Sequence, residues 1–402
     1  MIILNSPASK GDTMKKLSNS MLVDTILNFN EADVNKYKYG KGITANFLEH
    51  AAEKYGLDFE KPENTRITTL LYKNNEVARM SGLRPSSTAD VAYKLCKDKF
   101  RLEKYLKLMN LNTLSSAHFK KNEYIDALKY IQSNNNQMFV IKPLSLAGGK
   151  GIQFGVNDNT FEHAWENSIR TQEAEGVLDP SCVIQPFING FDVRVTIIEG
   201  RYCGALLRLP AHVVGDGERN IFQLVHDKND LRKTISYFKN KLIVNDERLD
   251  ISLEQKGLSK DYVPDKNEVI MLSEISNLTQ GGESIDITHV LSKNIKQLAI
   301  NAAASIPGLY STGIDIMTED YKNGDGYIIE MNTSANLTMH HLPLKGKKRF
   351  PYHFFVRTSL IKHKVEKNTM LTRRELEIWS EVSEFLKLKD RYACETLKMI
   401  DF

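Results

Sequence analysis

The chain has 402 residues, which is longer than one ordinary domain, so two or three domains are expected. Its net charge of +4 is small, and acidic and basic residues are mixed along the chain, which argues against a nucleic-acid-binding surface. No apolar run approaches the roughly 20 residues of a membrane span, and polar residues interrupt the N-terminal stretch where a signal peptide would need an apolar core. We therefore expect a cytoplasmic protein with neither a membrane nor a nucleic-acid partner.

The cysteines are few and widely separated. They form no CxxC pair and no zinc-binding spacing, and they are Cys96, Cys182, Cys203 and Cys394. This usage predicts free thiols in a reducing compartment.

Residues 1–95 are predicted to form a small N-terminal α/β domain. Apolar residues at helical spacing between Ile43 and Tyr55 predict a helix that ends at Gly56, and residues 67–72 predict a short strand. Nothing in this domain indicates a catalytic residue.

Residues 96–185 contain a strand, a glycine-rich loop and a second strand. Residues 138–143 read as an apolar strand that carries Lys142, and residues 144–151 form the loop before a strand at 152–156. Bare glycine backbone can approach phosphate groups closely, so the loop is a candidate flap. It matches neither a P-loop nor a dinucleotide-binding fingerprint, and an ordinary turn is the alternative interpretation.

Residues 186–350 begin with two predicted strands that carry Arg194 and Arg208, joined by a turn at Glu199-Gly200. A helix-rich insertion follows to about residue 264, and residues 294–306 predict an amphipathic helix. After residue 350, helical spacing in residues 372–386 predicts a helical C-terminal tail, at 351–402.

Within this third region, residues 313–317 and 327–332 predict two strands joined by a tight turn, because Asn323-Gly324 and Asp325-Gly326 are hairpin-turn sequences. Side chains alternate along a strand, so Asp315, Glu330 and Asn332 can converge on one face. Two carboxylates and an amide oxygen suit Mg²⁺, with Mn²⁺ as an alternative. A solvated polar face is the competing interpretation.

Taken together, these segments resemble the ATP-grasp superfamily of carboxylate–amine ligases, and in particular the ATP-grasp domains of cyanophycin synthetase and of bifunctional glutamate–cysteine ligase/glutathione synthetase. The likeness covers about residues 85–350. Its most specific part is the string Leu207-Arg-Leu-Pro-Ala-His-Val-Val-Gly-Asp-Gly217, and Gly313-Ile-Asp315 and Glu330-Met-Asn332 follow it in the shared order. The resemblance implies an α+β fold of two subdomains that clamp ATP between antiparallel sheets.

The resemblance also implies roles for residues at the nucleotide. Lys99 and Lys142 match lysines that contact the ATP phosphates, and Asp192 matches the acid at the ribose. The flap over the phosphates corresponds to Ser145, Gly148, Gly149, Lys150 and Gly151. The segment whose backbone reads adenine includes Gln185, Phe187 and Ile188. The Mg²⁺ ligands of the family correspond to Asp315, Glu330 and Asn332.

The implied reaction is amide or peptide bond formation through an acyl phosphate, on an amino-acid or short-peptide substrate. Arg208, with Arg194 nearby, is the candidate cation for the oxyanion, and a structural salt bridge is the alternative for Arg194. Candidate substrate residues are Asn277, Gly281, Gly282 and His340. For His340, a packed, hydrogen-bonded histidine is a nearly equal alternative. By analogy with related ligases, we expect a homo-oligomer.

The sequence departs from the family at several positions, and two other functions remain open. Pro186 lacks an N–H in the adenine-reading segment, and Lys345 replaces a frequent acid, which puts the substrate in doubt more than the use of ATP. The alternatives are a phosphotransferase that uses the same ATP site and a nucleotide-binding regulator without turnover.

Overall fold

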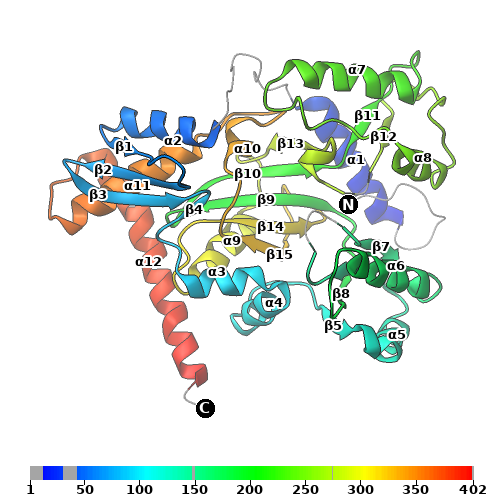
Figure 1. Cartoon of the computed structure of the whole chain (residues 1–402), viewed down its shortest axis with the longest axis horizontal. Coiled ribbons are helices and arrows are strands. Elements are labelled where there is room, and N and C mark those ends of the chain that lie inside the picture. Colours follow the sequence, from blue (N-terminus) through cyan, green and yellow to red (C-terminus); the bar gives the residue numbers. More distant parts are fainter. Residues whose placement is uncertain (1–11, 30–42, 147–149, 274, 401–402) are drawn as a thin grey trace.

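The computed structural model describes residues 12–29, 43–146, 150–273 and 275–400. Its centre is a five-stranded antiparallel sheet in the order β13 (Glu283–Asp286), β10 (Arg201–Leu209), β9 (Phe191–Ile198), β14 (Thr312–Thr318) and β15 (Tyr327–Asn332), which crosses the middle of Figure 1. The hairpin expected at 313–332 is present as β14 and β15, and the predicted α+β class is confirmed.

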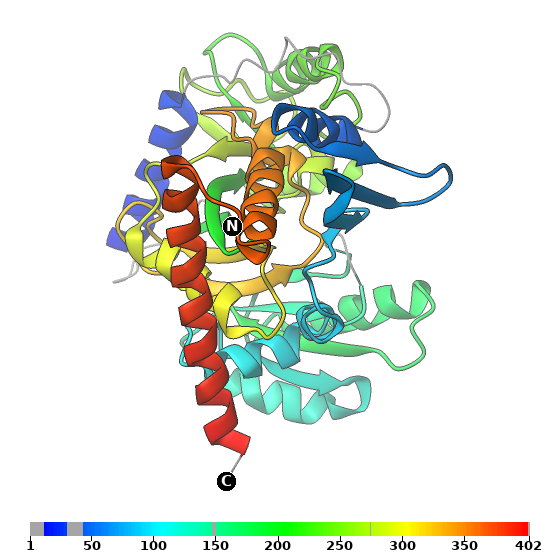
Figure 2. The ribbon, with the colours of Figure 1, turned by 90° about the vertical axis from the view of Figure 1, so that its left-hand side faces the viewer.

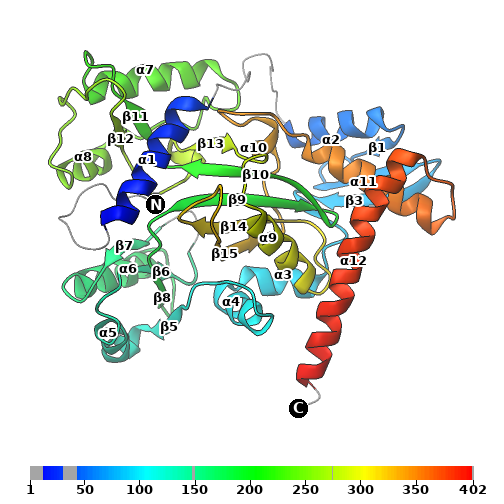
Figure 3. The same ribbon diagram turned by 180° about the vertical axis from the view of Figure 1, so that it is seen from behind.

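Strand β9 shows why the central sheet has one apolar and one polar face. Val193, Val195 and Ile197 alternate along it and are fully buried against the apolar side of α9 (Lys293–Ser305). Because side chains of a strand alternate, Asp192 and Arg194 project from the opposite face. Helix α1 (Asp12–Asn28) packs on the apolar face as well, and Figure 3 shows it in front of the sheet. The apolar face is thereby covered, whereas the part of the opposite face around Asp192 and Arg194 stays open.

A second antiparallel sheet lies across from the open face. Its order is β5 (Ala117–Lys120), β8 (Ser181–Pro186), β6 (Phe139–Pro143) and β7 (Gln153–Val156). Helices α5 (Tyr124–Gln132) and α6 (Phe161–Ala174) cover its far side and form a separate core with it, seen at the lower right of Figure 1. Helices α3 (Asp90–Lys97) and α4 (Lys99–Leu108) connect this unit to the N-terminal region, with the short η1 (Lys121–Glu123) after β5.

A third sheet consists of β1 (Asp58–Glu60), β2 (Ile67–Tyr72), β3 (Asn75–Ser81) and β4 (Arg84–Pro85). Helix α2 (Ile43–Lys54), which the sequence predicted, and α11 (Pro351–Glu366) pack with this sheet in one core that includes Leu48, Leu70 and Phe355. The N-terminal sheet and the first helix of the C-terminal tail therefore stabilise each other.

The helix-rich insertion contains α7 (Ile221–Thr234) and α8 (Glu247–Glu254) beside the strand pair β11 (His212–Val214) and β12 (Val269–Met271). Short helices η2 (Leu278–Gln280) and α10 (Thr338–His341) border the central sheet. The last helix, α12 (Arg373–Ile400), runs along the side of the molecule past α9 in Figure 2. None of the helices in the described part of the chain combines the length and apolar character that a membrane span needs.

Glu199, in the turn between β9 and β10, fastens four separate segments together. Its buried carboxylate accepts hydrogen bonds from Ser87 Oγ at 2.7 Å and Ser311 Oγ at 2.9 Å, and it pairs with Lys362 Nζ at 2.6 Å. Burial raises the pKa of this carboxyl, but the Lys362 ion pair and the serine hydroxyls outweigh burial, so the pKa lies below its ordinary value. The carboxylate is therefore most useful to the fold when it is ionised.

We expect Glu199→Gln to lower the free energy of unfolding by about 1–3 kcal/mol at neutral pH, because it removes a buried charged hydrogen-bond acceptor. The folded-state pKa lies below the unfolded value of about 4.3, so this stabilisation is complete above that pH and is lost as pH falls through the folded-state pKa. Denaturant unfolding of both proteins at a series of pH values measures the difference. Glu381→Gln is the control, because its ion pair with Arg201 involves a carboxylate that is 58% exposed and is expected to contribute little. Equal losses in the two variants would contradict the role of Glu199.

Candidate functional site

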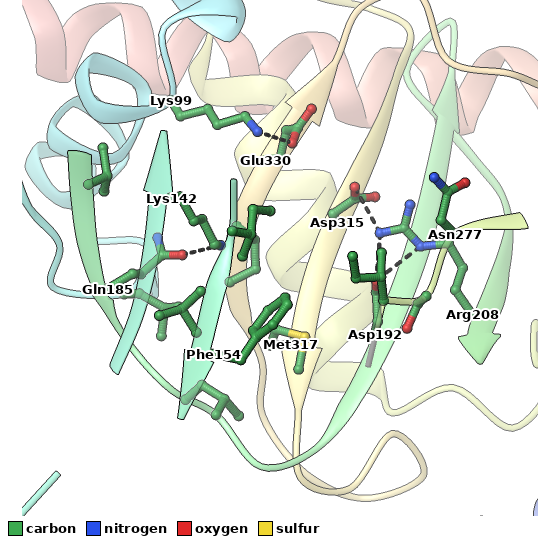
Figure 4. A pocket seen from close by; sticks show the side chains of 18 of the residues that line it. Lys99, Lys142, Phe154, Gln185, Asp192, Arg208, Asn277, Asp315, Met317 and Glu330 are labelled. Carbon is green, nitrogen blue, oxygen red and sulfur yellow. Dashed lines mark hydrogen bonds and ion pairs between the residues drawn. The ribbon is translucent and has the colours of Figure 1, made fainter. Parts of the chain in front are cut away.

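A cavity of about 550 Å³ lies between the central sheet and the second sheet. Residues of β6, β7 and β8 form one wall, and residues of β9, β10, β14 and β15 form the other, as Figure 4 shows from close by. Its charged lining residues are Lys99, Glu103, Lys142, Asp192, Arg194, Arg208, Lys241, Asp315 and Glu330. Such a concentration of convergent charges in a concave site is typical of a binding or catalytic centre.

The antiparallel register of the central sheet sets the main ion pairs of the cavity. Asp315 on β14 lies directly opposite Arg194 on β9, and Arg208 on β10 lies directly opposite Asp192 on β9. Directly opposite residues of an antiparallel pair project from the same face at close range, so each acid meets a guanidinium. Arg208 donates to Asp192 Oδ1 at 2.7 Å and also lies 2.9 Å from Asp315 Oδ2, which links the two pairs.

The charged network continues from Asp315 to the edge of the cavity. Arg194 donates to Asp315 Oδ2 at 3.0 Å. With the Asn332 amide turned so that its oxygen faces donors, that oxygen accepts from Arg194 at 3.3 Å and its nitrogen donates to Glu330 Oε1 at 3.0 Å. Glu330 Oε2 in turn lies 2.9 Å from Lys99 Nζ. Asp98 caps the N-terminus of α4 by accepting from the backbone N–H of Arg101 at 3.0 Å, which places Lys99 in the first turn, facing β15.

The two aspartates of this network differ in their proton affinity. Burial raises the pKa of Asp315, but Arg194 and Arg208 outweigh burial and lower it to about 2. For Asp192, burial and the nearby Asp315 charge raise the pKa above its ordinary value, although Arg208 acts against them. Asp315 is therefore a firmly ionised carboxylate at neutral pH.

The residues that the sequence suggested as metal ligands do converge. Asp315 and Glu330 lie directly opposite each other on β14 and β15, beside a register shift, and Asn332 follows on the same face. The donors of this site are two carboxylates and one amide. In the part of the chain that the structure describes, there is no cluster of three or more His, Cys, Asp or Glu side chains that could hold a metal ion. Hard oxygen donors of this number fit Mg²⁺. Arg194, Arg208 and Lys99 now neutralise the same oxygens, so a bound cation would share them with these side chains.

At the opposite wall, Lys142 on β6 contacts the side-chain oxygen of Gln185 on β8, and Figure 4 shows both away from Arg208. Gln185 also donates to Ser116 Oγ at 2.8 Å. Burial lowers the pKa of Lys142 to about 8, with the Lys99 charge as a second cause.

Apolar side chains surround Lys142. They line the cavity and include Leu114, Val140, Phe154, Val183, Met317 and Ile329, and apolar side chains of this kind suit the ring of a bound ligand. Pro186, Phe187 and Ile188 line the same end, where the Phe187 N–H is already bonded to the Met138 carbonyl at 2.8 Å.

The structure separates the residues predicted for the flap. Gly148 and Gly149 lie outside the described residues, and Ser145 is exposed. Lys150 pairs with Glu175 at 2.7 Å, beyond α6, and Gly151 has a φ of +69° where it packs on Pro143 and Thr171. None of these described residues lines the cavity, and Ile152 and Phe154 do so instead.

Of the candidate substrate residues, one lines the cavity and the others do not. Asn277 lines the cavity next to Arg208 in Figure 4. Gly281 and Gly282 do not line it: their carbonyls accept hydrogen bonds from Arg232, at 2.7 and 3.2 Å. His340 is buried on the same face of the central sheet as Arg194 but outside the lining of the cavity, and it is bonded to Thr196 Oγ1 at 2.7 Å, with its pKa lowered to about 3 by burial. The alternative interpretation of His340, as a packed histidine, therefore describes its surroundings.

Several lining residues were missed in the sequence. Phe154 and Met317 lie two positions beyond Ile152 and Asp315, so strand alternation alone was a signal for them. Lys241 and Asn336 lie in loops that no motif covers, and only the folded chain brings them to the cavity.

Comparison with known proteins gives concordant results. A family model described as ATP-grasp domain matches residues 96–335. The glutathione biosynthesis bifunctional protein GshAB of Pasteurella multocida is 29% identical over 299 residues, which are 71% of this chain and 38% of that protein. Cyanophycin synthetase of Synechocystis sp. is 31% identical over 238 residues, 56% of this chain and 26% of that protein. This chain therefore spans well under half of the length of these relatives.

Among solved structures, the crystal structure of a bifunctional glutathione synthetase from Pasteurella multocida superposes with a TM-score of 0.59. The match covers 82% of this chain and 44% of that chain at 24% sequence identity. At this identity the likeness establishes the fold.

We expect Gly281→Ala to destabilise the fold more than Gly257→Ala does, although both glycines have positive φ, of +85° and +69°. A Cβ at Gly281 would come within 2.5 Å of Ile243 Cα, whereas a Cβ at Gly257 would meet nothing within 4 Å. The left-handed backbone costs each variant about 1–2 kcal/mol. Crowding adds about 1–3 kcal/mol at Gly281 alone. Denaturant unfolding measures both losses, and losses of the same size would show that Gly281 is not confined by Ile243.

Proposed function

The chain belongs to the ATP-grasp family, and on that basis we propose that it is an ATP-dependent carboxylate–amine ligase that forms an amide or peptide bond and releases ADP and phosphate. The observation that carries the proposal is the continuous charged network from Lys99 to Asp192 along the open face of the central sheet. Phosphoryl transfer depends on positioned charges more than on covalent help from the protein, and this network supplies them.

We place the nucleotide at the end of the cavity that contains Lys142. The apolar part of the cavity that includes Phe154 and Met317 accepts the adenine ring, and the Pro186–Ile188 segment lies at its edge. Lys142 and Lys99 then face the phosphates, and Asp192 accepts from the ribose with the lone pairs that Arg208 leaves free. Since Pro186 has no N–H and the N–H of Phe187 is occupied, adenine would be read through other backbone groups of the segment.

Asp315, Glu330 and Asn332 are the residues that would hold Mg²⁺, or Mn²⁺, in this arrangement. A divalent ion supplies charge neutralisation for the transferred phosphoryl group. Glu330 is more accessible than Asp315, with 28% of its side chain exposed against 11%, and both oxygens of Asp315 are paired with guanidinium groups.

The proposed reaction uses the chain's own cations at two points. A carboxylate becomes an acylating agent once its oxygen accepts the γ-phosphoryl group, and Lys142, Lys99 and Arg194 offset the charge of that group. The amine of the second substrate then attacks the acyl carbon, and phosphate leaves. Arg208, held by Asp192 and Asp315, is the fixed donor for the oxyanion that forms in this step.

The test of this proposal is phosphate release measured across pairs of amino acids and short peptides, each partner alone and both together. A ligase requires both partners. ADP formation with one partner and no dependence on an amine would instead identify a phosphotransferase, and the absence of turnover with every pair would favour a regulator.

We expect Glu330→Gln to reduce ATP turnover by about a hundredfold or more while the protein remains folded, because the substitution removes one of only two negatively charged ligands for Mg²⁺. The Lys99 ion pair that is lost is exposed, so its effect on stability is small. Turnover at a series of Mg²⁺ concentrations, with a melting curve for each variant, measures both effects. Asp325→Asn, on the exposed turn of the same hairpin, is the matched control and retains turnover. Wild-type turnover in folded Glu330→Gln would remove Glu330 from the metal site.

We expect kcat/KM for ATP to fall as the pH rises above about 8, because Lys142 loses its proton there and no longer attracts phosphate. Lys142→Arg remains protonated at these pH values and should lack this alkaline decrease. Lys150→Arg, whose parent lysine pairs with Glu175 outside the cavity, should keep it. An unchanged alkaline decrease in Lys142→Arg would assign it to another group.

A further inference from the structure

Among the described residues, some charged side chains that line the cavity have a partner of opposite charge and others do not. Each lining carboxylate is paired with a cation: Asp192 with Arg208, Asp315 with both arginines, Glu330 with Lys99, and Glu103 with Lys107 at 2.9 Å. Two lining ammonium groups have no carboxylate within 4.0 Å among the described residues. One is Lys142, at the end proposed for the nucleotide, and the other is Lys241.

Lys241 has a firmly held backbone. The buried Arg232 donates to the carbonyl of Lys241 at 2.6 Å and to the carbonyls of Gly281 and Gly282, so it joins the turn after α7 to the loop that carries Asn277. Asn229 further fixes the next residues, because its side chain bonds both the N–H and the carbonyl of Ile243, at 2.8 and 2.9 Å. The position of Lys241 is thus set by the fold rather than by its own side chain.

The ammonium group of Lys241 retains binding capacity. It donates to the carbonyl of Tyr237 and lies 3.7 Å from the centroid of the Tyr237 ring. An ammonium has three donors, so these contacts leave it able to bind an anion. Burial lowers the pKa of Lys241, with the Arg232 charge as a second cause, and a bound anion would relieve both effects.

Lys241 lies at the end of the cavity away from the nucleotide. Through Arg232 it is attached to the loop of Asn277, and Figure 4 shows Asn277 beside Arg208, across the cavity from Lys142 and Gln185. The basic stretch 345–349, a sequence hint of an acidic partner, does not line the cavity: Lys345 donates to the Ile26 carbonyl, and Arg349 pairs with Asp286.

We propose that Lys241 binds a second carboxylate of the substrate, so that the molecule activated beside Arg208 is a dicarboxylic amino acid or an acidic peptide. The inference rests on the proposed ligase function, because it takes the Arg208 end of the cavity as the substrate end. It assigns substrate specificity to a residue that lies outside every motif.

The test compares acids with their isosteric amides. Calorimetric titrations use protein saturated with Mg²⁺ and a non-hydrolysable ATP analogue, with glutamate against glutamine, and aspartyl-aspartate against its amide as probes. We expect the wild type to bind the acid of at least one pair about tenfold to a hundredfold more tightly, as a charged hydrogen bond provides. Lys241→Met should lose this preference, and Lys241→Arg should retain it. Methionine keeps the apolar stem over Tyr237, and melting curves check that both variants fold.

Lys239→Met is the matched control, because Lys239 is an exposed lysine of the same turn and should leave the acid preference intact. A wild type with no preference for either acid, or a Lys241→Met variant that keeps the preference, overturns the proposal. Phosphate release measured in parallel separates the two levels of inference. Release that does not depend on an amine refutes the ligase function even if the Lys241-dependent preference is present, and amine-dependent release with an unaltered preference in Lys241→Met refutes only the role of Lys241.

Discussion

The structure of the cavity depends on the pairing of Asp315 with Arg194 and of Asp192 with Arg208 across three neighbouring strands. These side chains are only 10–19% exposed, and charges so largely withdrawn from water are costly unless each meets an opposite charge. Here the register of the sheet ensures this, because each acid lies directly opposite an arginine. The same register turns the apolar residues of β9 and β14 toward α9, so one alternation produces both the core and the charged face. A shift of one residue in β9 would bury the charges in the core and expose Val193, Val195 and Ile197.

The two ends of the cavity differ in chemistry, and this difference supports a division of roles. At the Lys142 end, apolar side chains surround one ammonium of lowered pKa, which suits a planar ring with phosphates attached. At the Arg208 end, Asn277 and Asn336 offer hydrogen bonds, and Lys241 offers an ammonium group that pairs with no carboxylate of the described residues. Between the two ends, the charges of the network are neutralised by ion pairs within the network. A bound ligand would therefore replace one partner of such an ion pair instead of meeting an isolated charge.

The walls are held in place by contacts that lie outside the cavity. At the turn between β9 and β10, Glu199 bonds Ser87, Ser311 and Lys362. Arg232 connects the turn after α7 to the loop before β13 by hydrogen bonds. Gly281 and Gly282 allow that loop to approach Ile243 and the Leu209 carbonyl more closely than any side chain would permit. Such residues contribute to the site by fixing the backbone that presents Asn277 and Lys241.

The sequence by itself determined the strands and the hairpin, because alternation and turn residues are local signals, and the order of its motifs indicated the family. Period-two spacing predicted that Asp315, Glu330 and Asn332 share a face, and the family resemblance pointed to Asp192, Arg194 and Arg208. Only the tertiary structure decided that glycines such as Gly281 allow close packing outside the cavity, and that His340 packs against Thr196 away from the cavity lining. Only the fold brought Lys241 to the substrate end, because its position is set by hydrogen bonds from Arg232 between segments that are distant in sequence, and no local pattern encodes such a contact.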